Sequence, residues 1–497
     1  MPDSADNFPS ALYSAAQVRQ LDASLIVAGT PGFELMGLAA RAMWRALRRR
    51  WSDVGELTVL AGRGNNAGDG YLIAELAQRA GWQVKVLAVG ETGALAGDAL
   101  LAFKQAQEAG VLIEPWSEHA VLCGVVVDAL LGTGLKGEVR APYAAVIARL
   151  NGSGLPVLAV DIPSGLSADT GQVLGCAVRA DITFTVIGLK IGLFTGQAPE
   201  YVGQIQFDDL HASPAIVAGQ AAIGQRLVGG NVAQLPARQP TVHKGQLGHV
   251  LVVGGDLGFA GAALLAAQTA LRSGAGLVSV ATRAEHVNAA QARIPEVMAA
   301  SVASANQLLA LAKNASVLVV GPGLGQGAWG RSLLSVAAIS WMPQVWDADA
   351  LNLLAKDCVS VPANCVITPH PGEAARLLGL SSAQVQSDRP AAALELAKRF
   401  NAVCVLKGAG SLIADPGGQL RLCDRGHPVM AGAGLGDVLA GLIGALIAQG
   451  LSSFDAASLA VWLHALAGER LAAKGVGLAA SDLCNAIRQL LQEQSVV

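Results

Sequence analysis

The pattern that most restricts the fold is a short apolar run followed by a glycine-rich loop and a helical segment, and it occurs in both halves of the chain. Residues 57–61 lead into the loop 62–70, and residues 250–253 lead into the loop 254–262. A strand, a glycine loop and a helix in this order form the first turn of a doubly wound parallel sheet, where the loop can bind a ligand. The pattern therefore predicts an α/β fold in each half.

Length and composition fit two domains of this kind. A chain of 497 residues is too long for one ordinary core and suits two domains of roughly 200–270 residues each. Hydrophobic residues make up 52% of the chain and aromatic residues only 4%, which is typical of parallel sheets covered by helices. Residues 211–230 are rich in Ala, Gly and Gln. We therefore expect an N-terminal Rossmann-like three-layer domain at residues 1–222 and a second doubly wound domain at residues 223–497.

Charge and cysteine usage exclude several classes of protein. The 34 basic and 37 acidic residues give a net charge of −3, so nucleic acid and anionic membranes are not expected as partners. The N-terminus has neither a basic start nor an apolar segment, which predicts a cytoplasmic protein. Seven scattered cysteines without a CxxC pair predict reduced core thiols rather than a metal site or a disulfide framework: Cys123, Cys176, Cys358, Cys365, Cys404, Cys423 and Cys484.

Polar loops follow the predicted strands of the first half. Loops at the carboxyl ends of parallel strands gather in one crevice, so Asn66, Asp128, Asp161 and Ser164 can converge although they are far apart in sequence. Each of them can equally be a helix cap or a turn residue. The strands on which this expectation rests are predicted at residues 57–61, 84–89, 124–128, 156–160 and 183–187.

Three of these loops resemble the motifs of the NAD(P)H-hydrate epimerase family: residues 62–70, residues 128–132 and Asp161-Ile-Pro-Ser-Gly165. The resemblance extends over roughly residues 14–210. It implies that Asn66, Asp128 and Ser164 bind a potassium ion and that Asp161 contacts the substrate as its acid or base. The implied substrate-binding residues are Asn65, Asn66, Ala67, Gly68, Asp69, Gly132, Thr133, Gly134, Leu135, Lys136, Gly137, Glu138 and Asp161.

Two positions in the first glycine loop depart from the family pattern. Arg63 stands where the family usually has proline, and Ala67 stands where it usually has glycine. If position 67 needs a positive φ, Ala67 adds strain on the order of 1 kcal/mol. We therefore expect a loosened loop if the backbone there is left-handed.

Charged side chains follow several predicted strands of the second half. Asp347 and Asp349 would face the same way if their strand persisted, and could then hold magnesium, although Asp349 can equally cap the next helix. His370 and Glu373 flank two prolines in a turn that either fixes polar groups beside a ligand or starts a helix. Lys407 ends another strand beside glycines, which suits contact with a nucleotide phosphate.

The stretch near the C-terminal end combines glycines with one carboxylate. Gly432, Gly434 and Gly436 occupy every second position of this stretch. Because glycine has no side chain, they allow a tight backbone turn that residues with a Cβ could not adopt. Free N–H groups at a helix start attract phosphate, and Asp437 at that place is suited to take a proton from a hydroxyl that attacks phosphorus. The alternatives are a glycine-rich buried helix start and a membrane span over residues 429–451, and Asp437 with its glycines favours the buried helix over the span.

Five motifs of the second half occur in the order found in the ADP- or ATP-dependent NAD(P)H-hydrate dehydratase family, which has a ribokinase-like fold. They are His243-Lys-Gly, Gly321-Pro-Gly-Leu-Gly, Thr368-Pro-His-Pro-Gly-Glu, Leu406-Lys-Gly-Ala-Gly-Ser and Gly434-Leu-Gly-Asp, within about residues 236–490. The resemblance implies Asp437 as catalytic base and substrate contacts from Ala262, Gly323, His370 and Asp437. The implied nucleotide contacts are Lys407, Gly408, Ala409, Gly410, Ser411 and Gly436, with magnesium bound to the nucleotide.

The tandem order resembles the bacterial family of bifunctional NAD(P)H-hydrate repair enzymes. It implies that the first domain interconverts the R and S forms of hydrated NADH or NADPH. The second domain would dehydrate the S form with ADP and release AMP and phosphate. A ribokinase-type kinase for a vitamin or sugar, with an accessory Rossmann-like domain, is the alternative, and a non-catalytic metabolite sensor is a further one. We expect small-molecule ligands and a homo-oligomer.

Overall fold

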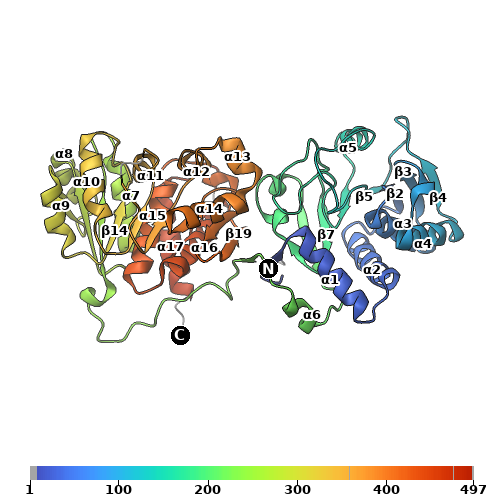
Figure 1. Ribbon diagram of the computed structural model, residues 1–497, viewed down its shortest axis with the longest axis horizontal. Helices are drawn as coiled ribbons and strands as arrows, with labels where there is room; N and C mark the ends of the chain where they lie inside the picture. Colours follow the sequence, from blue (N-terminus) through green and yellow to red (C-terminus); the bar gives the residue numbers. More distant parts are fainter. Residues whose placement is uncertain (1–7, 357–358, 474, 495–497) are drawn as a thin grey trace. The chain divides into compact units, whose positions relative to one another are not determined.

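The computed structural model describes residues 8–356, 359–473 and 475–494. It contains two compact units, Met1–Gln225 (unit 1) and Arg226–Val497 (unit 2), whose elements are labelled in Figure 1. Two expectations fall outside the described residues, namely the thiol of Cys358 and the character of residues 1–7. The other six cysteines carry free thiols; four of them are buried, while Cys123 and Cys176 are only half-buried.

Unit 1 is built on a seven-stranded sheet in the order β4-β3-β2-β5-β6-β7-β9, and every neighbouring pair is parallel. The five predicted strands are confirmed to within a residue or so, because each is a buried apolar run. The edge strands β4 and β9 lack such a run, since most of their residues are exposed or half-buried. The strands are β2 (Glu56–Ala61), β3 (Gln83–Ala88), β4 (Leu112–Pro115), β5 (Val125–Ala129), β6 (Val157–Val160), β7 (Ile182–Val186) and β9 (Gln204–Asp208).

Among the described residues, three short strands, six α-helices and three 3-10 helices complete unit 1, and β1 pairs in parallel with β8 and antiparallel with β10. The segment 211–230 carries α6 and β10, so it is more structured than its weak periodicity predicts. The elements are β1 (Ala11–Tyr13), β8 (Leu189–Lys190), β10 (Gly224–Arg226), α1 (Ala15–Val27), α2 (Gly32–Arg50), α3 (Asn65–Arg79), α4 (Gly97–Glu108), α5 (Tyr143–Asn151), α6 (Pro214–Gly219), η2 (Thr92–Ala94), η3 (Ile191–Phe194) and η4 (Ala198–Glu200).

The first glycine loop is shorter than the sequence indicates. Helix α3 begins at Asn65 rather than near Tyr71, with Gly64 as its N-cap. Ala67 is therefore helical and buried, and it does not have a positive φ, so the strain considered for this position is absent. The glycine at position 68 allows close packing of α3 against α2, because a Cβ there would lie 2.7 Å from the Met36 side chain.

Unit 2 has strands in the order β13-β12-β11-β14-β15-β16-β17-β18-β19, parallel from β13 to β17 and antiparallel beyond. These strands are β11 (His249–Val253), β12 (Leu277–Thr282), β13 (Met298–Ser301), β14 (Val317–Val320), β15 (Gln344–Trp346), β16 (Cys365–Ile367), β17 (Val403–Leu406), β18 (Ser411–Ala414) and β19 (Leu420–Cys423). The helices are α7 (Ala260–Arg272), α8 (Ala284–Arg293), α9 (Ala305–Ala312), α10 (Ala328–Ala338), α11 (Asp349–Leu354), α12 (Pro371–Leu378), α13 (Ser382–Ser387), α14 (Arg389–Phe400), α15 (Leu435–Ala448), α16 (Ser453–Ala472), α17 (Ala480–Gln494), η5 (Lys244–Leu247) and η6 (Pro428–Met430).

Helices α7 and α15 pack closely side by side. A Cβ at Gly441 of α15 would lie only 2.1 Å from the carbonyl oxygen of Ala266 in α7, and a Cβ at Gly434 would lie 2.8 Å from the Leu265 side chain. At their other ends, the side-chain amide of Gln449, the C-cap of α15, donates to the carbonyl of Ser273, the C-cap of α7, at 2.9 Å. The helices therefore run parallel, and their N-termini lie at the same end. This packing places Ala262 and Asp437, which lie in the first turns of these helices, at the same end of unit 2.

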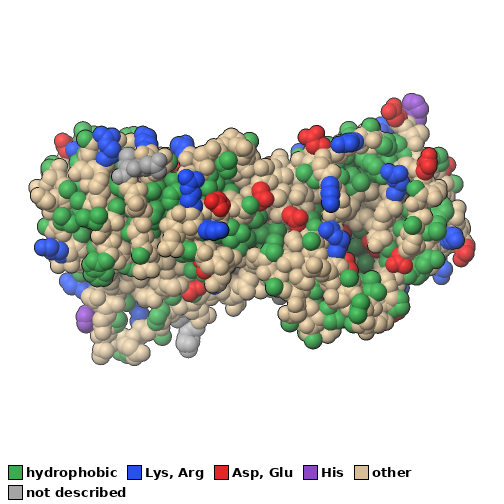
Figure 2. Space-filling model, in the orientation of Figure 1, with side chains coloured by type: hydrophobic (Ala, Val, Ile, Leu, Met, Phe, Trp, Pro, Cys, Tyr) green, Lys and Arg blue, Asp and Glu red, His purple; other side chains and the backbone are tan. Residues whose placement is uncertain are grey.

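The helices and the surface of the protein bear on the expectations about membranes and charge. Among the described residues, no single helix has the length and apolar character needed to span a bilayer, and only the sharply bent pair of α1 and α2 meets these criteria jointly. Helix α15 is apolar because it is buried in the core of unit 2. Acidic and basic side chains are interspersed on the face shown in Figure 2.

Candidate active sites in the two units

The predicted potassium ligands of unit 1 come together where β2, β5 and β6 end. The hydroxyl and the N–H of Ser164 donate to the two carboxylate oxygens of Asp128, at 2.6 and 2.8 Å. The Asn66 amide donates to the carbonyl of Val160 at 3.1 Å. The N–H of Leu131 donates to the Ser164 hydroxyl oxygen at 2.8 Å, which fixes the loop beside them. Three strand-end side chains therefore form one polar cluster.

The chemistry of this cluster fits a hard cation. Burial raises the pKa of Asp128 to about 6, although hydrogen bonds from Ser164 and Leu130 lower it, so the carboxylate is mainly ionised at neutral pH. Within the described part of the chain, no side chain forms an ion pair with Asp128. The side-chain oxygen of Asn66 lies beside Gly132, where a Cβ would be 3.0 Å away from it. Oxygen donors around a buried negative charge are the set that a hard cation prefers.

Asp161 forms the second polar group of unit 1. It follows β6 with φ of 66°, a left-handed conformation that aspartate tolerates better than most residues. The ammonium group of Lys190 forms an ion pair with Asp161, and it also donates to the Thr185 hydroxyl at 2.7 Å. Lys190 is fully buried, whereas the Asp161 side chain is 18% exposed. The carboxylate is therefore held from inside and reachable from the crevice.

The sequence did not indicate Lys190 and Thr185 as site residues. Their only signal is the presence of polar residues in β7 and β8, which are almost entirely buried, and β7 carries a second buried threonine, Thr183. Asp69 is brought to the same crevice, and burial together with the nearby Asp161 and Asp22 raises its pKa well above the usual value. The predicted substrate loop 132–138 follows β5 and is largely exposed. Asp22 was likewise not predicted.

Unit 2 has its polar cluster at the N-terminus of α15. Gly434 is the N-cap and has φ of 85°, so it needs the left-handed conformation that glycine allows. A Cβ at Gly436 would lie 3.3 Å from Nζ of Lys407 and 3.4 Å from a carboxylate oxygen of Asp347. The nearest neighbour of a Cβ at Gly432 would be 3.7 Å away, which is ordinary contact. Two of the three alternating glycines are therefore required, one by its φ and one by close approach.

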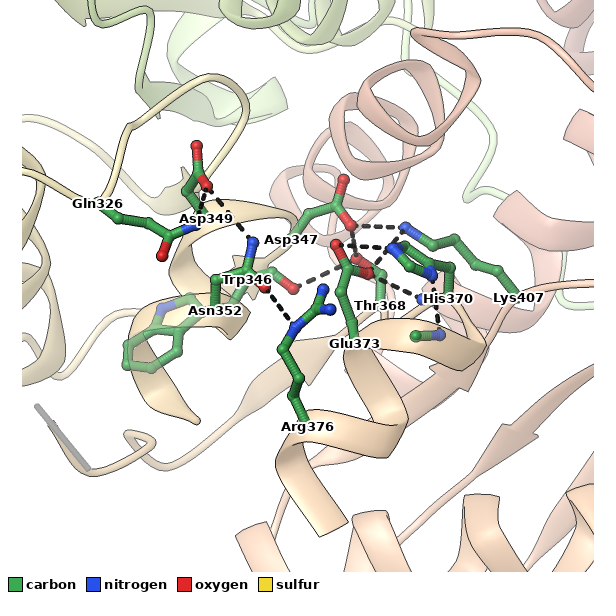
Figure 3. Close-up of polar contacts among 11 residues, drawn as sticks. Gln326, Trp346, Asp347, Asp349, Asn352, Thr368, His370, Glu373, Arg376 and Lys407 are labelled. Atoms are coloured by element: carbon green, nitrogen blue, oxygen red, sulfur yellow. Dashed lines mark hydrogen bonds and ion pairs between the residues drawn. The ribbon is translucent and has the colours of Figure 1, made fainter. Parts of the chain in front are cut away.

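Lys407 joins the carboxylates of this cluster (Figure 3). Its Nζ lies 2.7 Å from Oδ1 of Asp347 and 3.8 Å from Oε2 of Glu373. The Thr368 hydroxyl donates to the same Asp347 oxygen at 2.8 Å. Burial lowers the pKa of Lys407, but Asp347 and Glu373 outweigh this effect and raise the pKa above its usual value. A fixed positive charge thus lies beside the helix N-terminus, where an anion would be stabilised.

Asp347 and Asp349 do not face the same way, so they do not form a pair of ligands for one metal ion. Strand β15 ends at Trp346, so Asp347 turns toward Lys407 while Asp349 opens α11 and accepts the N–H of Gly325 at 2.9 Å. Ala348, rather than Asp349, is the N-cap of α11. In the described ranges no three His, Cys, Asp or Glu side chains are grouped as a metal site. A magnesium ion here would therefore be held mainly by nucleotide phosphates, as is usual for this ion.

His370 and Glu373 start helix α12 as a capping box. The N–H of His370 donates to Glu373 at 2.8 Å, and Nδ1 of His370 accepts the N–H of Gly372 at 3.0 Å. Burial, Lys407 and Arg376 lower the pKa of His370, so the ring is neutral at pH 7. An accepting Nδ1 in a neutral ring assigns the proton to Nε2. His370 can therefore donate a hydrogen bond toward the site as well as start the helix.

Asp437 is prepared to act as a base near neutral pH. Burial raises its pKa to about 7, and Asp347 adds to the rise while Lys407 opposes it. Burial also raises the pKa of Glu373 to about 7. A general base is most effective when its pKa lies near the working pH. The carboxyl groups are electrostatically coupled, because Asp347 raises the pKa of both Asp437 and Glu373, and Glu373 also raises that of Asp437.

A pH profile tests this electrostatic arrangement. Since the base must be ionised, kcat/KM of the nucleotide-dependent reaction should rise with pH and level off above an apparent pKa near 7. The variant Glu373→Gln removes one negative charge next to Asp437, so we expect its rising limb to move to lower pH. Steady-state rates between pH 5 and 9 would measure both. An unmoved limb in Glu373→Gln would contradict the coupling.

The two predicted substrate-contacting residues Ala262 and Gly323 adjoin each other. A Cβ at Gly323 would lie 3.3 Å from Cβ of Ala262 and 2.5 Å from the carbonyl oxygen of Phe259. The N–H of Asp256 donates to the Gly323 carbonyl at 2.6 Å, which ties the loops after β11 and β14 together. Because α7 and α15 run parallel, this wall lies at the same end of unit 2 as Asp437.

The predicted nucleotide loop, residues 407–411, is held from inside by a residue that the sequence did not indicate. Arg389 is buried, and its guanidinium donates at 3.3 Å to each of the carbonyls of Leu406, Lys407 and Gly410. The Ser411 hydroxyl donates to the carbonyl of Gly408 at 2.9 Å. The loop therefore turns its carbonyls inward. Arg389 begins α14, and nothing in its sequence neighbourhood marks it as a partner of this loop.

We expect Arg389→Met to weaken nucleotide binding through the loop. The substitution leaves three carbonyls without a charged donor, so KM for the nucleotide should rise about tenfold and unit 2 should lose about 2–4 kcal/mol of stability. Steady-state kinetics and thermal unfolding measure these effects. Arg399→Met, at the exposed end of the same helix, is the matched control and should change neither. An unaltered KM in Arg389→Met would contradict the bracing role.

The two crevices define the class of protein: a two-domain α/β enzyme with a carboxylate cluster in each unit, one of them beside a lysine and a helix N-terminus. Residues 250–489 match the family model described as NAD(P)H-hydrate dehydratase, and residues 32–192 match the model described as YjeF-related protein N-terminus. The chain belongs to the family of bifunctional NAD(P)H-hydrate repair enzymes.

Relatives of this name match nearly the full chain. The bifunctional NAD(P)H-hydrate repair enzyme of Coxiella burnetii is 44% identical and covers 97% of this chain and 99% of its own length. The enzyme of the same name from Escherichia coli is 42% identical, over 94% of this chain and 91% of its own length. A ribokinase-like superfamily protein from Enterococcus faecalis superposes with a TM-score of 0.50 at 26% identity, covering 54% of this chain and 95% of its own. The two doubly wound domains predicted from the sequence are thereby confirmed.

Proposed function

We propose that this protein restores hydrated NADH and NADPH. Unit 1 interconverts the R and S epimers of the hydrate, and unit 2 dehydrates the S epimer with ADP as phosphoryl donor, giving AMP and phosphate. The observation that carries the proposal is the placement of Asp437, whose pKa is raised to about 7, beside Lys407 at the N-terminus of α15. A base next to an anion site is what phosphoryl transfer to a substrate hydroxyl requires.

In unit 2, Asp437 takes the proton of the hydroxyl on the hydrated ring as that oxygen forms its bond to phosphorus. Lys407 and the N–H groups at the start of α15 hold the transferred phosphate, while Ala262, Gly323 and His370 hold the hydrate. The loop of Lys407, Gly408, Ala409, Gly410 and Ser411, with Gly436, holds the nucleotide. Magnesium supplies charge neutralisation on the phosphates when bound. Departure of phosphate with the C–O electron pair and loss of a ring proton then restore the reduced nicotinamide.

In unit 1, Asn66, Asp128 and Ser164 would hold potassium, whose charge offsets that of the buried Asp128. Asp161, held by Lys190, contacts the hydrated ring and moves a proton. The dinucleotide lies along the start of α3 (Asn65, Asn66, Ala67, Gly68 and Asp69) and the loop 132–138. We assign epimerisation to residues 1–222 and dehydration to residues 223–497, in a cytoplasmic homo-oligomer.

One experiment tests both assignments. Purified protein is incubated with mixed hydrate epimers and ADP, ATP or no nucleotide, while near-ultraviolet absorbance and epimer ratio are followed. We expect epimer exchange in every arm and recovery of reduced-nicotinamide absorbance only with nucleotide. A stable phosphorylated product without recovery would favour the ribokinase-type kinase for a vitamin or sugar. A constant epimer ratio without nucleotide would remove the assignment of unit 1.

A further inference from the structure

Helix α1 lies outside residues 32–192, which match the family model, yet it contacts the loop 132–138 proposed to bind the epimerase substrate and the segment that follows Asp161. The N–H of Ala15 donates to Asp169 at 2.7 Å, in the segment that follows Asp161 and Ser164. The guanidinium of Arg19 lies 3.3 Å from the carbonyl oxygen of Thr133, in the loop 132–138. Two polar contacts, one turn apart, thus join α1 to the two sides of the crevice.

The packing of α1 turns Asp22 toward the ion pair of Asp161 and Lys190. Tyr13, just before α1, is paired in register with Lys190. A Cβ at Gly188 would lie 3.2 Å from the Val18 side chain and 3.4 Å from that of Leu21, so this face of α1 covers β8. Residues three and four apart share a helix face. Asp22 follows Val18 by four positions and Arg19 by three, which places it between β8 and the loop 132–138.

Asp22 is a half-buried carboxyl group to which the described residues give no hydrogen bond or ion pair. The charged groups that face it are Asp161, Lys190, Arg19 and Asp69. Burial raises the pKa of Asp22 to about 6, and Asp161 adds to the rise while Lys190 and Arg19 oppose it. Two nearby carboxyl groups thus differ in environment, since Asp161 is ion-paired and Asp22 is not. When two carboxyl groups lie in such different environments, their pKa values move apart, so that one can act as the acid and the other as the base.

We propose that Asp22 is a second catalytic residue of the epimerase, acting as the acid to the base of Asp161; this inference rests on the proposed function of unit 1. Asp22 donates its proton to the ring hydroxyl, and the C–O bond breaks with its electron pair leaving on water. The lone pair of the ring nitrogen forms a C=N bond in its place. Water then adds to the opposite face of that carbon and gives its proton to Asp161. Each conversion leaves one proton fewer on Asp22 and one more on Asp161, and either proton exchange with solvent or a conversion in the reverse direction, with the two roles exchanged, restores the starting protonation states.

The test compares Asp22→Asn with wild type in the full chain. Exchange between purified R and S hydrates is measured without nucleotide by chromatography, and ADP-dependent dehydration of the S hydrate is measured in parallel. We expect exchange to fall by about 10²-fold or more, the usual loss for a general acid, with dehydration unchanged. In wild type, kcat/KM for exchange should decline as pH rises through the pKa of the acid, and this decline should disappear in Asp22→Asn. The exposed Asp53→Asn is the matched control and should behave as wild type.

The outcomes separate the inference from the proposed function. If wild type shows no exchange, the function of unit 1 is wrong. If wild type exchanges the epimers and Asp22→Asn does so at the same rate and with the same pH profile, the role of Asp22 is overturned. If Asp22→Asn unfolds, Asp22→Glu decides: a retained but shifted alkaline decline supports the acid, and an unshifted one overturns it.

Discussion

Asp437→Asn should lower the nucleotide-dependent rate by about 10²–10⁴, the range for loss of one general base, while epimer exchange continues. The amide cannot accept the hydroxyl proton during phosphoryl transfer, although it fills the same space. Asn also resembles the protonated carboxyl, which burial and Asp347 already favour below pH 7. We therefore expect the variant to fold normally and to bind nucleotide, with the loss confined to kcat.

The measurement is recovery of reduced-nicotinamide absorbance from S hydrate with saturating ADP. Epimer exchange in the same sample is the internal control, because it depends on the other unit. Thermal unfolding of unit 2 should not shift downward. The pH profile gives a second criterion, since whatever rate remains should no longer rise through pH 7. Near-wild-type turnover in Asp437→Asn would remove Asp437 from the reaction.

Where the carboxyl ends of parallel strands meet, the sequence was sufficient to predict which side chains lie close together. Asn66, Asp128 and Ser164 each follow a buried apolar run, and parallel strands bring such positions together whatever the helices between them do. Gly436 and Asp437 could be predicted for a different reason, because a glycine turn before an apolar helix exposes the helix N-terminus. The roles of these residues remain predictions, although their placement in the two crevices follows from topology.

Partners that depend on packing could not be predicted. Lys190 reaches Asp161 because β8 pairs with β1 and is buried beneath α1, and this pairing leaves no periodic signal in three- and two-residue strands. Arg389 reaches its loop from the start of a helix. The start of α3 was placed too late because Asn and Gly are weak helix formers, whereas the tight packing of α2 against α3 selects them here. Tertiary contacts override local propensity at each of these places.

Lys190→Met should abolish epimer exchange and destabilise unit 1, the largest combined effect that the structure predicts there. The variant leaves the Asp161 carboxylate without its buried partner, and breaking a buried ion pair by removing one member costs about 3–5 kcal/mol. Asp161 is 18% exposed, so we expect the lower end of that range. Exchange should fall by at least about 10²-fold, because the base loses the group that orients it. Unfolding of unit 1 and epimer ratios measure the two effects.

The double variant Asp161→Asn with Lys190→Met distinguishes orientation from folding. Removing both charges leaves no unpaired carboxylate, so we expect much of the lost stability to return while exchange stays absent. Dehydration of pure S hydrate should remain at the wild-type rate in both variants, since unit 2 is unaltered. If the double variant regained exchange together with stability, Asp161 would be a structural residue and Lys190 its folding partner. If stability returns but exchange does not, Asp161 and Lys190 are assigned to the epimerisation reaction. That reaction converts the R hydrate into the S hydrate that unit 2 uses.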